Sequence, residues 1–132
     1  MRGFHDNIEE LTLKNTAFRE VLYTGEHSQL VLMCLAPKQD IGSEVHGDTD
    51  QFFRFEAGVG KVVIDDNEYA VEDGTAIVVP AGATHNIINT SETDDLKLYT
   101  IYSPPHHEDG VVHETKDEAK QDDEEFDGDT TE

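Results

Sequence analysis

The sequence predicts an all-β protein, built as a closed barrel or as a pair of packed sheets. From Ala17 onward, short runs rich in β-branched and aromatic residues alternate with turn residues at intervals of about eight to twelve positions. Ten glycines and four prolines suit a fold with many tight turns better than a helical bundle. The length of 132 residues fits one domain that can bury most of its unfolded surface.

Nine runs carry the strand pattern. In chain order they are FREVLYT (18–24), QLVLMCLA (29–36), SEVH (43–46), QFFRFEAG (51–58), KVVID (61–65), EYAVED (68–73), TAIVVP (75–80), HNIIN (85–89) and LKLYTIY (96–102). Asp65, Asp66 and Asn67 predict a hairpin turn, because Asp and Asn tolerate a positive φ. So many short strands require an architecture that closes or protects its sheet edges.

The two ends of the chain lack this pattern. Residues 1–16 form a lead-in segment in which a single helical turn is expected. The β-barrel is expected over residues 17–105, and an acidic tail over residues 106–132. From Lys116 onward the tail has one aromatic and almost no apolar residue, which predicts disorder. A short helix at residues 114–121 is marginal at this length.

The charge of the chain is strongly negative. Thirty acids against nine bases give −21. Residues 108–132 hold twelve acids and two lysines, so the other 107 residues hold 18 acids and seven bases and carry −11 themselves. Because molar salt shortens the screening length to about 3 Å, we expect a salt-adapted (halophilic) protein. An ordinary acidic protein with an acidic tail is the alternative. In either case the negative field excludes nucleic acid and anionic membranes as partners.

The sequence favours a cytoplasmic location. Its longest apolar run, residues 30–36, is far shorter than the ~20 residues of a membrane span. The N-terminal MRGFHDNIEE has no hydrophobic region of the signal-peptide type. The single cysteine, Cys34, lies within the apolar LVLMCLA and is expected to be a buried, unreactive side chain.

A stretch in the second half carries a recognisable motif. The pattern G-x5-P-x-G-x2-H-x3-N is filled at every fixed position by Gly74, Pro80, Gly82, His85 and Asn89. The glycines and the proline shape a tight turn between two strands, and the histidine leaves this turn on the inner face. The motif is the second one of the cupin superfamily, which the chain resembles over about residues 18–103. The resemblance implies a cupin double-stranded β-helix, or jelly-roll barrel.

The first cupin motif, G-x5-H-x-H-x(3,4)-E-x6-G, is matched in part. Gly58 fixes the register and places Gln51 where the family has Glu. His46 stands at the second histidine position and Glu44 at the first, while Lys38 replaces the leading glycine. The resemblance therefore implies a metal site with two ligands changed in kind. Its members would be Glu44, His46, Gln51 and His85.

Strand alternation supports this arrangement. Residues i and i+2 of a strand project from one face about 7 Å apart, so Glu44 and His46 are expected to point together. Gln51 shares its face with Phe53 and Phe55, which gives a polar ring above an aromatic floor. One carboxylate, two imidazoles and one amide oxygen suit a divalent transition metal such as Zn²⁺, Mn²⁺, Fe²⁺, Co²⁺ or Ni²⁺. A metal-free cupin, with Glu44 at a solvated edge and Gln51 bonded to backbone, is the alternative.

Other polar residues near the motifs have simpler interpretations. Asp48 and Asp50 lie between the two halves of the first motif and are expected to be solvated. Asp50 would be a substitute ligand if Gln51 turned away. Three histidines that follow the last predicted strand are expected to be loop residues, namely His106, His107 and His113.

Three classes of function are compatible with the resemblance. Similar small cupins are described as mannose-6-phosphate isomerase-like, which implies a metal-dependent isomerase of a sugar or small hydroxy-carbonyl compound, with Glu44 and His85 as catalytic residues. The seven bases of the body are few for holding a phosphate. A non-catalytic sugar-binding protein and a non-haem metal oxygenase are the alternatives. By analogy with other single-domain cupins, we expect a homodimer with a small-molecule ligand.

Overall fold

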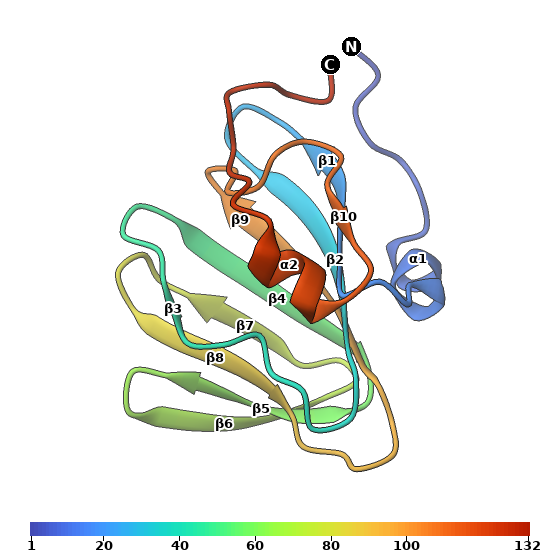
Figure 1. Ribbon diagram of the computed structural model, residues 1–132, viewed down its shortest axis with the longest axis vertical. Coiled ribbons are helices and arrows are strands. Elements are labelled where there is room, and N and C mark those ends of the chain that lie inside the picture. The colour runs from blue at the N-terminus through green and yellow to red at the C-terminus, as the bar shows by residue number, and fades with distance from the viewer.

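The computed structural model describes residues 1–132 and arranges ten strands in two antiparallel sheets around one core (Figure 1). One sheet has the order β10-β1-β2-β9-β4-β7 and the other the order β3-β8-β5-β6. The strands are β1 (Arg19–Thr24), β2 (Gln29–Leu35), β3 (Glu44–Val45), β4 (Asp50–Ala57), β5 (Val59–Ile64), β6 (Asn67–Glu72), β7 (Ala76–Val79), β8 (Thr84–Asn89), β9 (Leu96–Ser103) and β10 (Val112–His113). Each of the nine predicted runs overlaps one strand, and β10 is a tenth strand that was not predicted. The predicted all-β, double-sheet architecture is confirmed.

Alternating side chains on the central strands form the core. Along β9 buried and half-buried residues alternate from Leu96 to Tyr102, and along β4 the side chains of Gln51, Phe53 and Phe55 all face inward. The predicted polar position above two phenylalanines is therefore present. Cys34 is buried, and burial raises the pKa of its thiol to about 11, as expected for an unreactive side chain.

Backbone geometry explains several motif positions. Gly58 has a φ of +90°, and a Cβ there would lie 2.4 Å from the carbonyl oxygen of Asp95. Only glycine accepts both constraints. Lys38 stands where the cupin motif has glycine, and its φ of 64° keeps the left-handed conformation that a glycine would supply. Asp65 has a φ of 50° in the turn between β5 and β6, as predicted.

Two short helices lie outside the sheets. Helix α1 (Ile8–Lys14) begins after Asn7, whose side chain accepts a hydrogen bond from the Glu10 backbone N–H. Helix α2 (Lys116–Gln121) begins after Thr115, which caps it in the same way through Glu118. The helical turn predicted in the lead-in segment and the marginal helix in the tail are both present.

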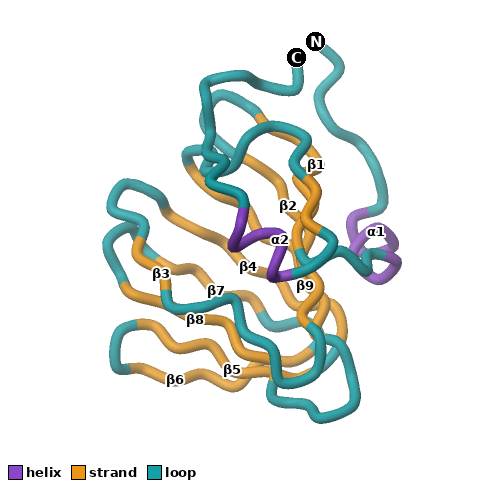
Figure 2. Tube along the Cα trace, viewed as in Figure 1, coloured by secondary structure: helices purple, strands orange, loops and turns teal.

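The prediction of a disordered acidic tail differs from the structure. After β9 the chain forms β10, which pairs with β1, and then α2 (Figure 2). Further on, the Phe126 N–H donates to the His106 carbonyl and the Thr131 N–H to the Thr24 carbonyl. The chain then ends beside the N-terminus, where Glu132 accepts from the Gly3 N–H (Figure 1). The composition of the segment did not predict this ordered structure, because the segment packs on the barrel and therefore needs no hydrophobic core of its own.

Two glycines with the same φ allow the cost of the close contact at Gly58 to be isolated. Gly74→Ala introduces strain alone, because no atom lies within 4 Å of a Cβ at this φ of +90°; we expect a loss of about 1–2 kcal/mol in the free energy of unfolding. Gly58→Ala adds a backbone collision, and we expect a loss well above that range. Urea denaturation of both variants measures the difference, and equal losses would show that the backbone at Asp95, just before β9, moves aside freely.

Candidate metal centre

The pairing of β3 with β8 brings the two cupin motifs together. In this register the Cα of Glu44 lies opposite that of His85, and Val45 lies opposite Thr84. His46 follows on the same face as Glu44, as strand alternation predicts. The ligand atoms of Glu44, His46 and His85 all lie within 4.8 Å of one another. Three of the four predicted metal ligands therefore form one cluster.

The turn of the second motif holds His46 in place. The Gly82 N–H donates a 2.8 Å hydrogen bond to the His46 carbonyl, at a residue whose φ is +89°. Downstream, the buried Asn89 amide donates to the carbonyls of Leu35, Ala36 and Asp94. The fixed residues of this motif thus hold neighbouring segments in register around His85.

The charges in the cluster suit a cation. Nε2 of His46 lies 3.0 Å from Oε2 of Glu44. Burial would raise the pKa of Glu44, but the hydrogen bond of His46 and the charges of His46, Arg19 and His85 together outweigh it and the pKa is lowered. Burial lowers the pKa of His85. At neutral pH the cluster therefore contains an ionised carboxylate and a neutral His85 imidazole, the forms that bind a metal.

Gln51 has an unused oxygen. Its side chain is only 2 % exposed, and its Nε2 donates to Oγ1 of Thr100 at 3.0 Å. Its Oε1 is buried and has no hydrogen-bond partner. A buried acceptor without a donor is costly, commonly by about 1–3 kcal/mol. The donor set that the sequence predicts therefore fits a cation, since the amide oxygen is free to bind one.

The loop acids do not contribute. Asp48 and Asp50 are both exposed. Oδ1 of Asp50 accepts the Ala81 N–H, and Oδ1 of Asp48 accepts from Thr49. Their interpretation as solvated acids agrees with the structure, although Asp50 is the first residue of β4 rather than a loop residue. Asp50 does not replace Gln51.

His106 is a site residue that the sequence interpretation placed in a loop. Its ring centroid lies 4.3 Å from that of His46, and its ring stacks on Tyr102 at 5.4 Å. Burial, helped by the charges of His107 and His46, lowers the pKa of His106 to about 4. The count of three histidines after the last predicted strand was the only sequence signal for this contact.

The other two histidines fasten the C-terminal segment to the barrel. His107 is buried, with Nδ1 2.6 Å from Oε1 of Glu124 and Nε2 3.2 Å from the hydroxyl of Tyr102. His113 is also buried, and its Nε2 lies 2.9 Å from Oδ2 of Asp122. Both histidines thus have structural partners. His107, like His106, lies in a loop as predicted, whereas His113 lies in β10.

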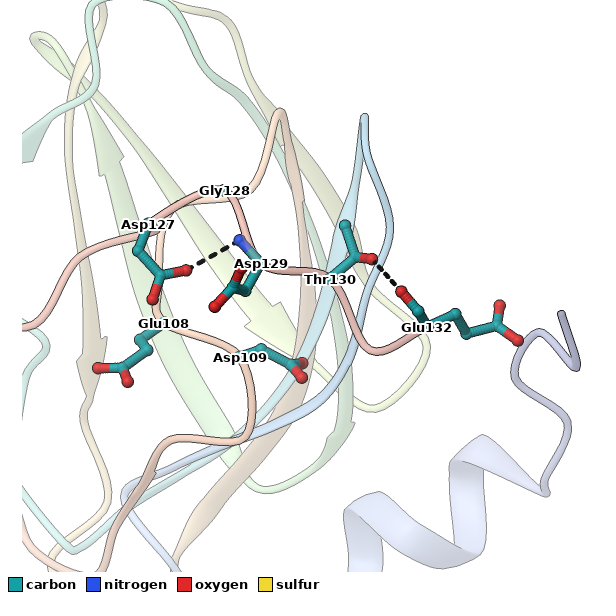
Figure 3. A pocket seen from close by; sticks show the side chains of 7 residues that line it. All are labelled: Glu108, Asp109, Asp127, Gly128, Asp129, Thr130 and Glu132. Carbon is teal, nitrogen blue, oxygen red and sulfur yellow. Dashed lines mark hydrogen bonds between the residues drawn. The ribbon is translucent and has the colours of Figure 1, made fainter.

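The largest cavity lies away from this cluster, near the C-terminus (Figure 3). It has a volume of about 500 Å³ and a purely polar lining that includes Asp109, Asp127 and Asp129. Asp127 accepts the Asp129 N–H, and Asp109 accepts from the hydroxyl of Thr131. These acids cap turns of the chain end, and none belongs to the metal-ligand cluster.

Fold and cluster together define a double-stranded β-helix protein with a candidate metal site between its sheets. The cupin domain family (Cupin_2) matches residues 31–102, more than half of the chain. The chain belongs to the cupin family. This agrees with the superfamily that the motifs indicate.

Relatives with similar sequences include two proteins described as uncharacterized. Protein YrkC of Bacillus subtilis (strain 168) is 49% identical over 124 residues, covering 89% of this chain and 66% of its own length. Protein L612 of Acanthamoeba polyphaga mimivirus is 49% identical over 109 residues, covering 80% of this chain and 68% of its own length. This chain therefore spans about two thirds of each relative.

A solved structure shows the same fold at similar identity. The crystal structure of BH2720 from Bacillus halodurans superimposes with a TM-score of 0.89 at 45% identity, covering 92% of this chain and 96% of that one. As for membranes, neither helix here has the length and apolar character that a crossing demands.

The lowered pKa of His106 predicts a pH-dependent stability. The unfolded chain binds this proton near pH 6.5 and the folded chain only near pH 4, so stability falls as the pH drops through this window. For metal-free protein, His106→Asn should remove a loss of about 1–2 kcal/mol between pH 7 and pH 4, because partial exposure of the ring reduces the effect of the full shift.

The measurement is urea denaturation at several pH values, with a chelator present. His27→Asn is the matched control, because the His27 side chain is 94% exposed and its replacement should leave the pH dependence intact. Parallel curves for wild type and His106→Asn would contradict the expected burial of His106.

Proposed function

We propose that this cupin binds one divalent transition metal and isomerises a small hydroxy-carbonyl compound. Glu44, His46 and His85 would hold the ion, with Oε1 of Gln51 as a fourth donor. The observation that carries the proposal is the convergence of the first three ligand atoms within 4.8 Å. The unpaired Gln51 oxygen supports the fourth position.

The ion, when bound, supplies Lewis acidity to a substrate oxygen and makes the adjacent C–H more acidic. The chain's own residues bind the ion, orient the substrate and exclude water. Gln51 is held by Thr100, which fixes the direction of its amide. Glu44 and His85, the two predicted catalytic residues, serve in this proposal at the metal itself.

His106 is the proposed proton acceptor. Its ring lies beside His46 and against Tyr102, outside the three-residue cluster. Its low pKa keeps the imidazole neutral at physiological pH, which is the form that can accept a proton from carbon. A neutral base next to an electrophilic centre is the arrangement that proton transfer between adjacent carbons needs.

Three further expectations from the sequence stay predictions. They are salt adaptation, a homodimer and a cytoplasmic location. The proposal keeps the reaction type of the mannose-6-phosphate isomerase-like assignment but not its phosphorylated substrate, because the seven bases of the body are few for holding a phosphate.

Metal content tests the first half of the proposal. Protein purified without added metal should contain close to one transition-metal ion per chain by elemental analysis. His85→Ala and Glu44→Gln should each weaken metal binding by at least about tenfold, since they remove ligands rather than their supports. His27→Ala, at an exposed turn, should retain the metal. Wild type that takes up no Zn²⁺, Mn²⁺, Fe²⁺, Co²⁺ or Ni²⁺ would refute the site.

Solvent proton exchange tests the second half. In D₂O the metal-loaded protein should introduce deuterium at the carbon next to the carbonyl of hydroxy-aldehydes, hydroxy-ketones or their acids, as followed by NMR. His106→Asn should slow this exchange by about 10²-fold while metal content is unchanged. Full metal content without exchange on any of these compounds would assign the protein to the non-catalytic binders.

A further inference from the structure

Arg19 is a buried cation that forms no direct ion pair, although its charge helps to lower the pKa values of Glu44 and Glu124. This β1 residue is 7% exposed, and its only side-chain hydrogen bond joins Nη1 to Nδ1 of His113 at 3.3 Å. Its Nε is buried and has no partner. None of the seven ion pairs of the structure includes Arg19, so no carboxylate lies within ion-pairing distance of its guanidinium. Guanidinium does not lose its proton in proteins, so the charge cannot be removed by titration.

Such a group is costly unless something binds it. Burying an unpaired charge is far less favourable than burying a paired one. The Phe18 ring, 5.3 Å from the guanidinium carbon, stabilises the charge in part through its π-electrons. It does not satisfy the Nε donor. An anion from outside the chain would reach the guanidinium through Nη2, which makes no hydrogen bond and is not among the buried atoms.

A cavity of about 220 Å³ opens beside this group, between the barrel and the C-terminal segment. Arg19 lines it together with Phe18, Ile41, Glu44 and Glu124. Glu44 also belongs to the metal-ligand cluster. A molecule in this cavity can therefore contact the guanidinium at one end and approach the candidate metal at the other.

Apart from the exposed Lys120, the other charges around the cavity have partners of their own. Lys116 lies 2.6 Å from Asp40. Glu124 is paired with His107, and Asp122 with His113. Arg19 is thus the buried positive charge that remains for a ligand, and it calls for one negative charge. A phosphate dianion fits less well, because Glu44, Asp122 and Glu124 lie on the same walls.

We propose that this cavity is the substrate subsite and that Arg19 binds the carboxylate of a small hydroxy or oxo acid. The planar guanidinium matches a carboxylate in shape and donor spacing. The oxygen on the neighbouring carbon would then lie toward Glu44 and the metal cluster. The volume equals that of roughly seven water molecules, which suits an acid of few carbons. This inference rests on the proposed function and narrows its substrate to an acid.

The test uses two probes of equal size and different charge, lactate and lactamide. Isothermal titration calorimetry on the full chain, both metal-loaded and metal-free, should give at least about tenfold tighter binding of lactate. Arg19→Gln should abolish this preference, and Arg19→Lys should restore part of it. Lys120→Gln is the matched control, because Lys120 lines the same cavity from an exposed position and should alter the preference less than threefold.

Several results would overturn the inference. Equal binding of lactate and lactamide by wild type would do so without any variant, even if Arg19→Gln failed to fold. So would the absence of binding for every hydroxy and oxo acid of two to six carbons, or tighter Arg19-dependent binding of inorganic phosphate. Metal content is measured separately on the same samples. Arg19-dependent lactate binding by protein that takes up no metal would refute the proposed function and support this subsite.

Discussion

The short pairing between β3 and β8 is the interaction on which the candidate site depends. Two residue pairs suffice to set Glu44 opposite His85, and the Gly82 N–H holds the next residue, His46, by its carbonyl. The first cupin motif alone supplies only two of the three clustered ligands, and the second alone supplies only one histidine. Only their register makes a three-ligand cluster, and any slip of β3 by one residue would turn Glu44 and His46 to the opposite face.

The C-terminal segment supplies the part of the candidate site that the barrel lacks. The barrel contributes Glu44, His46, His85 and Gln51, whereas the segment contributes His106 and one wall of the cavity beside Arg19. Two buried histidines with acidic partners, together with β10 and α2, hold it there. The acids of the segment are therefore not merely solvated charge, since Glu124 and Asp122 bind histidines of the same segment and help to position it.

The barrel could be predicted because each pattern that indicates it lies within a short stretch of sequence. Strand alternation, turn residues and the spacing from Gly74 to Asn89 each lie within a few residues, and the structure reproduces them. The position of His106 was not predictable, because its contact with His46 joins residues sixty positions apart through a segment whose composition indicates disorder. Arg19 was also invisible in the sequence. An arginine in an alternating strand is ordinarily a surface residue, and here the neighbouring β10 and α2 help to bury it.

The order of the chain has a consequence for how the site is made. During synthesis the chain emerges from its N-terminus, and the partners of the last segment lie far upstream: His107 follows Gln29 by 78 residues, and His113 follows Arg19 by 94. Closing such distant contacts is slow relative to forming hairpins. The ligand cluster can therefore assemble while the cavity wall is still within the ribosome. A metal ion would then meet the nascent cluster before the C-terminal segment covers part of it.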